Sequence, residues 1–510
     1  MKKKKFFFIL SIFIVLIAFT IIALLLNRLD IIDLGTTRIL LIWHYITIFL
    51  TILMWIVLLL NHNYSYSKTL WLFITFLLPG WGIILYFFFA RDFKTKILDE
   101  KRPMLASKEY LKYEPNLPFT LDDNYLNDIF RFSLNVSGRS LYQNNTKTQV
   151  LTNGDQMFPA LKEALRQAKK YIYMTFYIIK TDQMGREVLD ILKEKALEGL
   201  DVRLMYDSFG SNNFRLSRKY MKSLKAAGVK VIEFDCIQGI RVINILNRLN
   251  FRNHRKVTVI DGKYGFIGGM NLANEYNHLS NRFGFWRDTH LLVEGKGVIG
   301  LKNIFLKDWY YATGTWPETE EEVQEDIYHP GEFMVVESGP DYENMIIKDI
   351  YFKMINSAKR SIKIQTPYLI LEPEMLQALK NAAKSGVIVE IIVPGKPDKV
   401  FMNLATKSYY DVLLETGVRI YEYKNVFIHS KVMIIDDYLA SVGTVNFDPR
   451  SFNLNFEATA IIRDSSVDQL VYDFYEDRNR SNEILLNEWR KRPIFVKILQ
   501  GFINLFSPIL

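Results

Sequence analysis

Residues 253–261 (NHRKVTVID) and 428–436 (IHSKVMIID) repeat one pattern, His-x-Lys-x4-Asp, at a separation of 175 residues. The shared positions are His254, Lys256 and Asp261 in the first copy and His429, Lys431 and Asp436 in the second. A small-residue turn and an asparagine, Asn271 or Asn446, follow each copy at the same offsets. With only seven histidines in 510 residues, chance does not account for the whole repeated frame. We therefore predict two duplicated units that together build one site.

The surrounding sequence supports a duplicated α/β fold. A helical stretch and an apolar strand-like segment recur in the same order around Gly199 and Gly386, and a Gly-led strand begins at Gly228 and Gly417. Alternating helices and apolar strands indicate a sheet with helices packed on it. We expect two pseudo-symmetric halves, 147–325 and 326–510, each a mixed β-sheet flanked by helices.

The first half contains an insertion. The two copies lie 189 residues apart at Gly228 and Gly417 but 175 apart at the histidines, so about fourteen extra residues precede His254. Apolar residues and arginines alternate there at helical spacing. An ordinary surface helix fits this pattern, and so does a helix at the mouth of the site that dips into lipid.

The sequence predicts that residues 1–95 form a membrane-anchoring region. Apolar runs cover 6–26, 39–60 and 70–89, and each has about the 20 residues needed to cross the hydrocarbon of a bilayer. A cleaved signal peptide is the competing interpretation of the first run, but the run is too long and no small-residue cleavage site follows. Residues 96–146 are expected to form a linker and amphipathic connector.

Cations flank this region at both ends, at 2–5 and again beyond residue 90. Because cations favour the cytoplasmic side, both ends should lie there, which three full crossings do not allow. Pro79 and Gly80 interrupt the third run. We expect that run to be re-entrant or interfacial, leaving two spans and a cytoplasmic catalytic region.

The composition limits the classes of partner that we expect this chain to bind. The formal net charge is +9 and hydrophobic residues make up 49% of the chain. A basic chain suits an anionic partner such as lipid headgroups or nucleic acid. The three apolar runs that are long enough to cross a bilayer favour lipid. A single cysteine, Cys236, excludes an internal disulfide framework. The closing segment, residues 492–510, is apolar behind cations, so we expect either an interfacial tail or a buried helix.

The spacing within each motif indicates phosphate chemistry. Residues i and i+2 of a strand point the same way, so His254 and Lys256 share a face, as do His429 and Lys431. A lysine neutralises a phosphate charge, and a histidine acts as nucleophile or general acid. The amides of Asn271 and Asn446 are candidate phosphate-binding donors.

A catalytic histidine also needs an acceptor for its second ring nitrogen. Asp288 and Glu457, each in a strand-like segment beyond its motif, are the candidates, and the sequence does not show which acid serves which histidine. Asp261 and Asp436 are interpreted as structural, tying a strand end to the next turn. A lysine beside each histidine would repel a divalent cation, so we expect neither a metal nor another cofactor.

Longer segments carry a resemblance. The tandem motif is similar to that of the phospholipase D superfamily, and the flanking segments resemble bacterial cardiolipin synthases over essentially the whole chain. Those segments include FIGGMN, WRDTHLLVEG, TPYL, KSYYDVLLETGVRIYEY and VGTVNFDPRSFNLNFE. The resemblance implies that all six motif positions, Asp261 and Asp436 included, belong to the catalytic set. This chain departs from the family in having three apolar runs, where two spans are usual.

The resemblance also implies an activity. Two phosphatidylglycerols would give cardiolipin and glycerol through a phosphatidyl group carried on His254, with His429 as acid and base; the reverse assignment stays open. The expected partners are phosphatidylglycerol and anionic lipids of a bacterial cell membrane, with no nucleic acid. Alternatives within the superfamily are a phosphatidylserine synthase and a hydrolytic phospholipase D. A lipid-binding pseudoenzyme is a rival of another class, which the intact motifs oppose.

Overall fold

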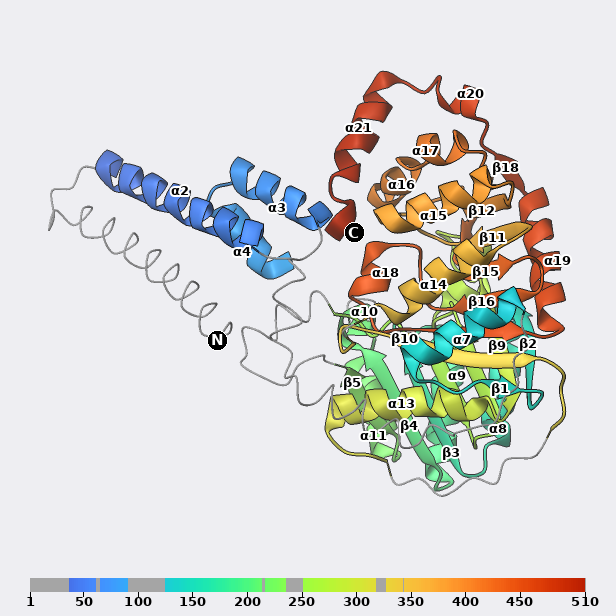
Figure 1. The fold of residues 1–510 in the computed structure, drawn as a ribbon. Helices are drawn as coiled ribbons and strands as arrows, with labels where there is room; N and C mark the ends of the chain where they lie inside the picture. The colour runs from blue at the N-terminus through green and yellow to red at the C-terminus, as the bar shows by residue number, and fades with distance from the viewer. Residues whose placement is uncertain are drawn as a thin grey trace, which may run out of the picture. The chain divides into compact units, whose positions relative to one another are not determined.

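A computed structural model describes residues 36–60, 65–89, 124–212, 216–234, 251–317, 327–342 and 344–509 (Figure 1). Three expectations fall outside the described residues: the apolar run 6–26, most of the linker, and the insertion before His254. The chain divides into two compact units, Met1–Glu100 with Ile509, and Lys101–Pro508 with Leu510.

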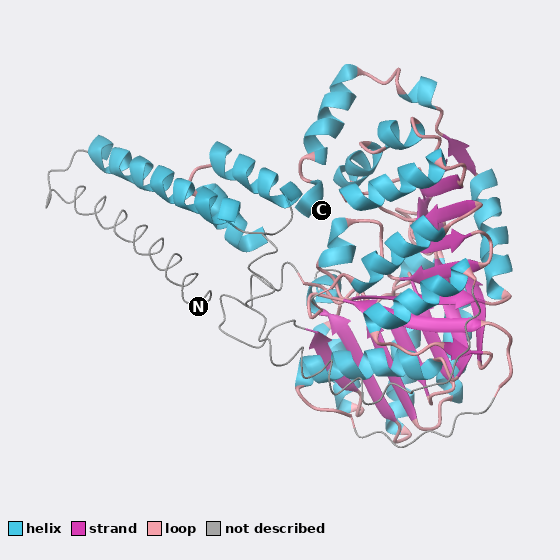
Figure 2. Ribbon diagram, viewed as in Figure 1, coloured by secondary structure: helices cyan, strands magenta, loops and turns pink. Residues whose placement is uncertain are grey.

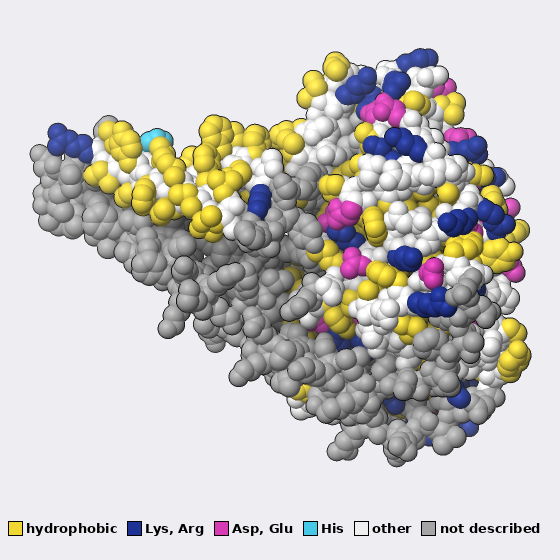
Figure 3. All heavy atoms as spheres, in the orientation of Figure 1, with side chains coloured by type: hydrophobic (Ala, Val, Ile, Leu, Met, Phe, Trp, Pro, Cys, Tyr) yellow, Lys and Arg dark blue, Asp and Glu magenta, His cyan; other side chains and the backbone are white. Residues whose placement is uncertain are grey.

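The N-terminal unit contains helices α2 (Thr36–Leu60), α3 (Ser65–Leu77) and α4 (Trp81–Phe89). Its small core consists of Met54, Leu58, Trp71, Ile83 and Tyr86. The indole of Trp55 donates a hydrogen bond to Thr75 Oγ1 at 2.9 Å, which fixes α2 against α3. Apolar side chains cover the outside of α2 and α3 (Figure 3).

Within the described residues, one helix is long and apolar enough to cross a membrane, over Leu41–Leu60. The third apolar run forms two short helices, because Pro79 lacks an amide hydrogen and Gly80 adopts a φ of +81°. Gly82 lets the two pack closely, since a Cβ there would lie 2.6 Å from the Thr75 backbone. Neither α3 nor α4 reaches the length of a membrane span.

The rest of the described chain is built on two large sheets (Figure 2). The first has seven strands, in the order β2 (Thr146–Thr152), β9 (Thr289–Gly295), β7 (Tyr264–Gly268), β6 (Val257–Ile260), β3 (Tyr171–Phe176), β4 (Asp201–Asp207) and β5 (Lys230–Phe234). The second has nine, in the order β1 (Tyr142–Gln143), β10 (Glu332–Ser338), β17 (Glu457–Arg463), β16 (Leu439–Gly443), β15 (Val432–Ile435), β11 (Ser361–Gln365), β12 (Ile388–Pro394), β13 (Arg419–Tyr423) and β18 (Ser481–Glu483).

The strand order of the first sheet recurs inside the second, with β1 and β18 added at the edges. The directions recur as well: β3, β4 and β5 are parallel, as are β11, β12 and β13, and the other neighbours are antiparallel. The mixed α/β class predicted from the sequence is therefore confirmed.

Helices lie on the outside of the strands (Figure 2). In the first half they are α8 (Gly154–Gln167), α9 (Gln183–Leu197), α10 (Ser208–Asn212), α11 (Arg218–Ala226), the 3-10 helix η2 (Asn274–Asn277) and α13 (Val298–Thr313). In the second they are α14 (Ile346–Ser357), α15 (Pro373–Lys384), α16 (Val400–Lys407), α17 (Tyr410–Leu414), α18 (Pro449–Asn453), α19 (Ser466–Asn479), α20 (Leu486–Trp489), α21 (Ile494–Asn504) and the 3-10 helix η3 (Ser507–Ile509).

The end of the expected connector packs on the second half, although in the chain it comes before the first half. Helix α7 (Tyr125–Ser137) buries Leu126, Ile129 and Phe130 in the same core as α14 and α15, and β1 pairs with β10. Asn124 caps α7 by accepting a hydrogen bond from Leu126 N at 3.0 Å. The predicted domain boundaries at 147 and 326 stay predictions.

The two halves meet along the middle of both sheets. Strand β7 contacts β16 and β17, and strand β9 contacts β16. A two-stranded parallel sheet of β8 (Trp286–Arg287) and β14 (Phe427–Ile428) crosses between the halves. These contacts place the ends of β6, β9, β15 and β17 next to each other, and the motif histidines and lysines and the two candidate acids lie at those ends.

Candidate active site

Each motif histidine is fixed where a strand begins. Val257–Ile260 and Val432–Ile435 are buried and, apart from Thr258, apolar, which favours the central strands β6 and β15. Lys256 and Lys431 directly precede these strands, and His254 and His429 lie two residues earlier. All four side chains are buried.

Backbone hydrogen bonds between the halves set the position of each histidine. Asn253 forms a parallel bridge with Phe456, and His254 N donates to Phe456 O at 2.9 Å. On the other side β14 pairs with β8, and His429 N donates to Arg287 O at 2.7 Å. Each histidine therefore lies beside the residue that precedes the acid of the opposite half.

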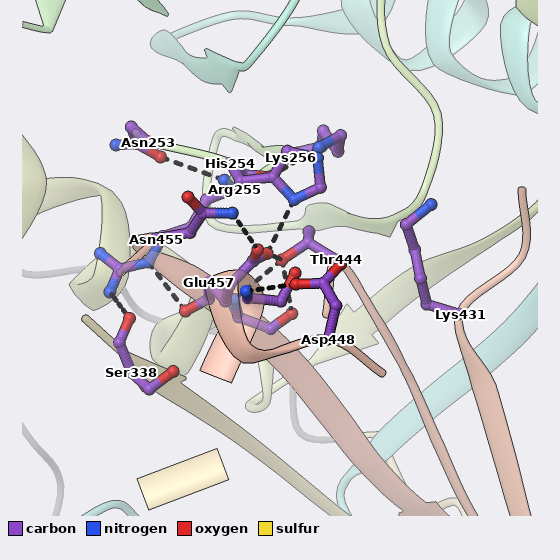
Figure 4. Close-up of polar contacts among 12 residues, drawn as sticks. Asn253, His254, Arg255, Lys256, Ser338, Lys431, Thr444, Asp448, Asn455 and Glu457 are labelled. Carbon is purple, nitrogen blue, oxygen red and sulfur yellow. Dashed lines mark hydrogen bonds and ion pairs between the residues drawn. The ribbon is translucent and has the colours of Figure 1, made fainter. Parts of the chain in front are cut away.

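The pairing of acids and histidines, left open by the sequence, is crossed. His254 Nδ1 lies 2.9 Å from Glu457 Oε2, and His429 Nδ1 lies 2.7 Å from Asp288 Oδ2. Figure 4 shows the His254 ring directed at Glu457. An ionised carboxylate accepts the Nδ1 hydrogen, so the lone pair of each ring is on Nε2. Neither half contains a complete histidine–carboxylate pair.

The two carboxylates are held differently. Glu457 accepts hydrogen bonds from Thr444 Oγ1 at 2.5 Å and from Asn455 Nδ2 at 3.1 Å (Figure 4). Asp288 Oδ1 accepts from Thr289 N at 2.8 Å. Gly269, at the position equivalent to Thr444, leaves room for Asp288, because a Cβ at 269 would lie 2.1 Å from Asp288 Oδ1.

The two lysines put positive charge into one shared region. Lys256 Nζ donates to His254 O at 2.6 Å, and Lys431 Nζ donates to His429 O at 2.5 Å. The charge of Lys431 also acts on His254, and that of Lys256 acts on His429. The two motifs therefore form one electrostatic site.

Burial controls the protonation of this site. Burial, together with the nearby lysines, lowers the pKa of His254 to about 4 and that of His429 to about 3. Burial likewise lowers the pKa of Lys431 to about 8, against the opposing effect of Asp288 and Glu457. Burial raises the pKa of Asp288 and Glu457, but the histidines and lysines outweigh it and hold both carboxyls ionised. Neutral imidazoles with exposed lone pairs suit nucleophilic or basic chemistry.

The two predicted phosphate-binding asparagines differ. Asn271 Oδ1 accepts from Ile178 N at 2.9 Å, and its Nδ2 donates to the Tyr276 hydroxyl at 2.6 Å. Asn446 is buried, and among the described residues its Oδ1 has no hydrogen-bond partner. The phosphate-binding role stays a prediction for both.

Asp261 and Asp436 lie at the opposite ends of β6 and β15 from the histidines. Asp261 accepts hydrogen bonds from the backbone amides of Lys169, Lys170 and Tyr171. Asp436 accepts from three amides in the equivalent positions, those of Lys359, Arg360 and Ser361, and from the Tyr125 hydroxyl. Both carboxylates therefore bind the start of a neighbouring strand.

Several residues of the site were not predicted. Tyr177 contacts the ring of His254 with 5.0 Å between centroids, and Tyr276 contacts His429 at 5.7 Å. Arg255, between the motif histidine and lysine, donates to Glu457 O at 3.0 Å and pairs with Asp308 of α13. The place of Arg255 inside the motif was a usable signal, whereas nothing in the sequence links Asp308 to the site.

This arrangement is suited to a transfer reaction at the phosphorus atom of a phosphodiester. Two lysines would neutralise a phosphodiester, and each of the two imidazoles presents one lone pair. Within the described ranges, no group of three or more His, Cys, Asp or Glu side chains is arranged to hold a metal ion.

This chain is similar to known proteins. The family described as "Cardiolipin synthase, PLD-like domain" matches residues 161–283 and 351–478, one segment in each half. Cardiolipin synthase 2 of Bacillus anthracis is 41% identical over 461 residues, covering 87% of each chain. A cardiolipin synthase of Geobacillus sp. (strain WCH70) is 40% identical over 447 residues, covering 86% of this chain and 88% of the relative.

Among solved structures, the phosphatidylserine synthase of Haemophilus influenzae Rd KW20 superposes with a TM-score of 0.57 at 16% identity. It covers 75% of this chain and 100% of its own length, and at that identity the likeness shows the fold alone. The two long relatives, together with the matched segment around each motif, decide the family: this chain belongs to the cardiolipin synthase family, within the phospholipase D fold.

Proposed function

We propose that this chain is a membrane-bound phosphatidyltransferase that converts two phosphatidylglycerol molecules into cardiolipin and glycerol. The observation that carries the proposal is the crossed pair of histidine–carboxylate contacts, His254 with Glu457 and His429 with Asp288. Two oriented imidazoles beside two lysines provide a nucleophile, an acid–base and charge neutralisation for one phosphodiester. The names of relatives about 40% identical over most of the chain support the same activity.

In the first half-reaction His254 Nε2 attacks the phosphorus of one phosphatidylglycerol. The N–P bond forms while the bond from phosphorus to the glycerol headgroup oxygen breaks. His429 gives its Nε2 proton to that oxygen, and glycerol leaves. The bound phosphodiester anion favours the imidazolium form of His429, which counteracts the lowering of its pKa by burial.

In the second half-reaction His429, now neutral, removes a proton from the terminal headgroup hydroxyl of another phosphatidylglycerol. The hydroxyl oxygen attacks phosphorus, the N–P bond breaks, and cardiolipin forms. One phosphodiester replaces another, so the chemistry requires no nucleotide. Water must be kept from the phosphohistidine for transfer to prevail over hydrolysis.

His254 is the better nucleophile candidate because its carboxylate is held more firmly. Glu457 accepts hydrogen bonds from Thr444 and Asn455 as well as from His254. A fixed carboxylate holds the imidazole in one orientation through the whole transfer. Asp288, with fewer side-chain contacts, suits a histidine whose protonation changes in each half-reaction.

The helix Leu41–Leu60 supports a location in the cell membrane. We propose two spans, the run 6–26 and α2, with the α3–α4 hairpin at the interface and the catalytic halves in the cytoplasm. Cations at both ends of the region favour this arrangement. A reporter fused to the C-terminus that becomes active outside the cell would contradict it.

The activity is tested by giving the purified full-length protein phosphatidylglycerol alone, in detergent micelles with a chelator present. The proposal expects cardiolipin and glycerol in equal amounts, and neither product from the His254→Ala variant. Phosphatidic acid as the main product would indicate a hydrolase. Phosphatidylserine formed only when serine and a phosphatidyl donor are supplied would indicate the serine transferase.

A further inference from the structure

One face of helix α21 is apolar and exposed. Ile494 and Phe495 are each 71% exposed, Ile498 is 64% exposed and Phe502 is 54% exposed. Positions 494, 498 and 502 follow each other at the spacing of one helical turn, so these side chains form a continuous stripe. Figure 3 shows hydrophobic side chains at this end of the catalytic unit, beside lysines and arginines.

The opposite face of α21 packs inward, so the exposed stripe is distinct from the face that contributes to the core. Ile503 belongs to the core of the second half, and Leu499 packs against that core. Gln500 is buried and accepts a hydrogen bond from Arg492 Nε at 2.9 Å. A helix that is apolar on both faces is typical of one covered on both sides, by protein or by lipid.

Helix α16 extends the apolar surface. It contacts α21 and exposes Val400 and Phe401 in its first turn. We name the α16–α21 surface by its apolar members, which are Val400, Phe401, Ile494, Phe495, Ile498 and Phe502.

The charges that the C-terminal segment brings to the α16–α21 surface have one sign, and two of them are paired, Arg490 with Glu415 and Arg492 with Asp411. From Trp489 to the end of the chain there are four cations, Arg490, Lys491, Arg492 and Lys497, and no acid. In the described part of the chain, Lys399, Lys491 and Lys497 form no ion pair with a carboxylate. An apolar stripe edged by free cations fits the boundary between acyl chains and anionic headgroups.

We infer that the α16–α21 surface docks onto an anionic bilayer, with its apolar side chains inserted at the headgroup boundary. A second copy of the chain fits less well, because a two-fold contact through this surface would bring the same cations together. The bilayer is also the phase that holds the lipid substrate, and in that respect the inference rests on the proposed function.

Docking there would hold the site close to its substrate. Lys399 and Asn403, at the start of α16, line a small surface pocket whose wall also includes Tyr368 and Phe427. The ring of Phe427 contacts that of His429 with 5.9 Å between centroids. Phe427 therefore links the wall of this pocket, at the start of α16, to the proposed acid–base.

The contact is tested on the full-length chain in vesicles of phosphatidylcholine and phosphatidylglycerol. An environment-sensitive fluorophore is attached to Ile498→Cys in a Cys236→Ser background, and spin-labelled lipids serve as quenchers. Leu197→Cys, at a site that is 69% exposed in α9, is the matched control. We expect strong quenching at 498 and little at 197.

The quenching at 498 should weaken in vesicles of phosphatidylcholine alone, and also after Lys491→Glu with Lys497→Glu. Equal quenching at 498 and 197 would contradict the inference. So would a fluorophore at 498 that is shielded from aqueous iodide but not quenched by lipid, because that result indicates a protein partner such as a second copy. This readout needs no catalysis, so it stands even if the proposed reaction fails.

Activity supplies a second test. Phe495→Asp with Ile498→Asp should reduce turnover in vesicles roughly tenfold, since two large apolar side chains no longer enter the bilayer. Turnover in detergent micelles should stay near wild type, which also shows that the variant folds. Equal loss in micelles and vesicles, or no loss in either, would overturn the inference.

Discussion

Burial is what makes the two histidines useful at neutral pH. An imidazole with the ordinary pKa of 6.5 would be partly protonated and would have lost part of its nucleophilic form. In this pocket, burial and the lysines keep His254 and His429 neutral, while the ionised carboxylates fix their Nδ1 hydrogens. The lone pair that attacks or accepts a proton is therefore present before substrate binds.

These shifts predict the pH dependence of kcat/KM for the release of nitrophenol from phosphatidyl-p-nitrophenol, which reports the free enzyme and whose leaving group needs no proton from His429. On the acid side, His254 with a pKa of about 4 gains a proton and loses its lone pair, so activity should fall only as pH drops toward 4. On the alkaline side, Lys431 with a pKa of about 8 loses its charge, so activity should fall from about pH 8. A profile with limbs near the ordinary values of 6.5 and 10.5 would contradict this account.

Gly269 gives a second prediction at this scale. In Gly269→Ala the new Cβ would lie 2.1 Å from Asp288 Oδ1, so Asp288 must move and His429 loses its support. Misplacement by about 1 Å costs roughly a hundredfold in kcat. Gly501→Ala is the matched control, because nothing lies within 4 Å of a Cβ there. Similar kcat values for the two variants would argue against the role of Asp288.

At the scale of elements, β6 and β15 each carry two functions at opposite ends. Lys256 and Lys431 directly precede the strands, inside the site, and Asp261 and Asp436 follow the strands and bind the amides of a neighbour. One motif thus combines the end that we propose to be catalytic with an anchoring end.

Asp436→Ala should therefore affect stability far more than chemistry. It removes the acceptor for the amides of Lys359, Arg360 and Ser361, and we expect the free energy of unfolding to fall by about 1–3 kcal/mol. Chemical denaturation measures the stability, and turnover per folded molecule should stay within about threefold of wild type. A loss of turnover as large as that of His429→Ala, at unchanged stability, would make Asp436 catalytic.

The sequence predicts much of this architecture because its signals are local. The duplicated motif, the apolar strands VTVI and VMII, and the interruption at Pro79 and Gly80 all depend on neighbouring residues. The α/β class and the mixed sheets followed from them.

What the sequence did not show depends on contacts between distant segments. The crossed pairing of His254 with Glu457 results from the bridge between Asn253 and Phe456, 203 residues apart, and no local pattern encodes it. The place of α7 in the second core, with the first half intervening in the chain, is hidden for the same reason. The hydrogen bonds of Asn271 with Ile178 N and with the Tyr276 hydroxyl could not be predicted from the spacing of residues either.

At the scale of the whole molecule, buried charged side chains form a second set of contacts between the halves, in addition to the histidine–carboxylate contacts. Arg255, which pairs with Asp308 in the first half, donates to the backbone oxygens of Glu457 and Ser338 in the second. Lys307 of the first half contacts Glu337 of β10. Such a network is destabilised when one partner is removed, since the remaining charge stays buried.

Arg255→Met tests this network. It leaves Asp308 without its guanidinium, and we expect a loss of about 3–5 kcal/mol in the free energy of unfolding. Arg131→Met, at an exposed pair with Asp128, is the matched control and should change stability by less than about 1 kcal/mol. Equal effects in the two variants would show that the buried network contributes little to joining the halves.

The central claim is that both halves supply one histidine each to a single reaction, and a double-mutant comparison of cardiolipin formation tests it most directly. His254→Ala and His429→Ala should each lower kcat by roughly a thousandfold or more, and the double variant should be no slower than either single variant, because neither imidazole works without the other. The contradicting result would be a single variant that keeps more than about 5% of wild-type turnover, or losses that multiply in the double variant.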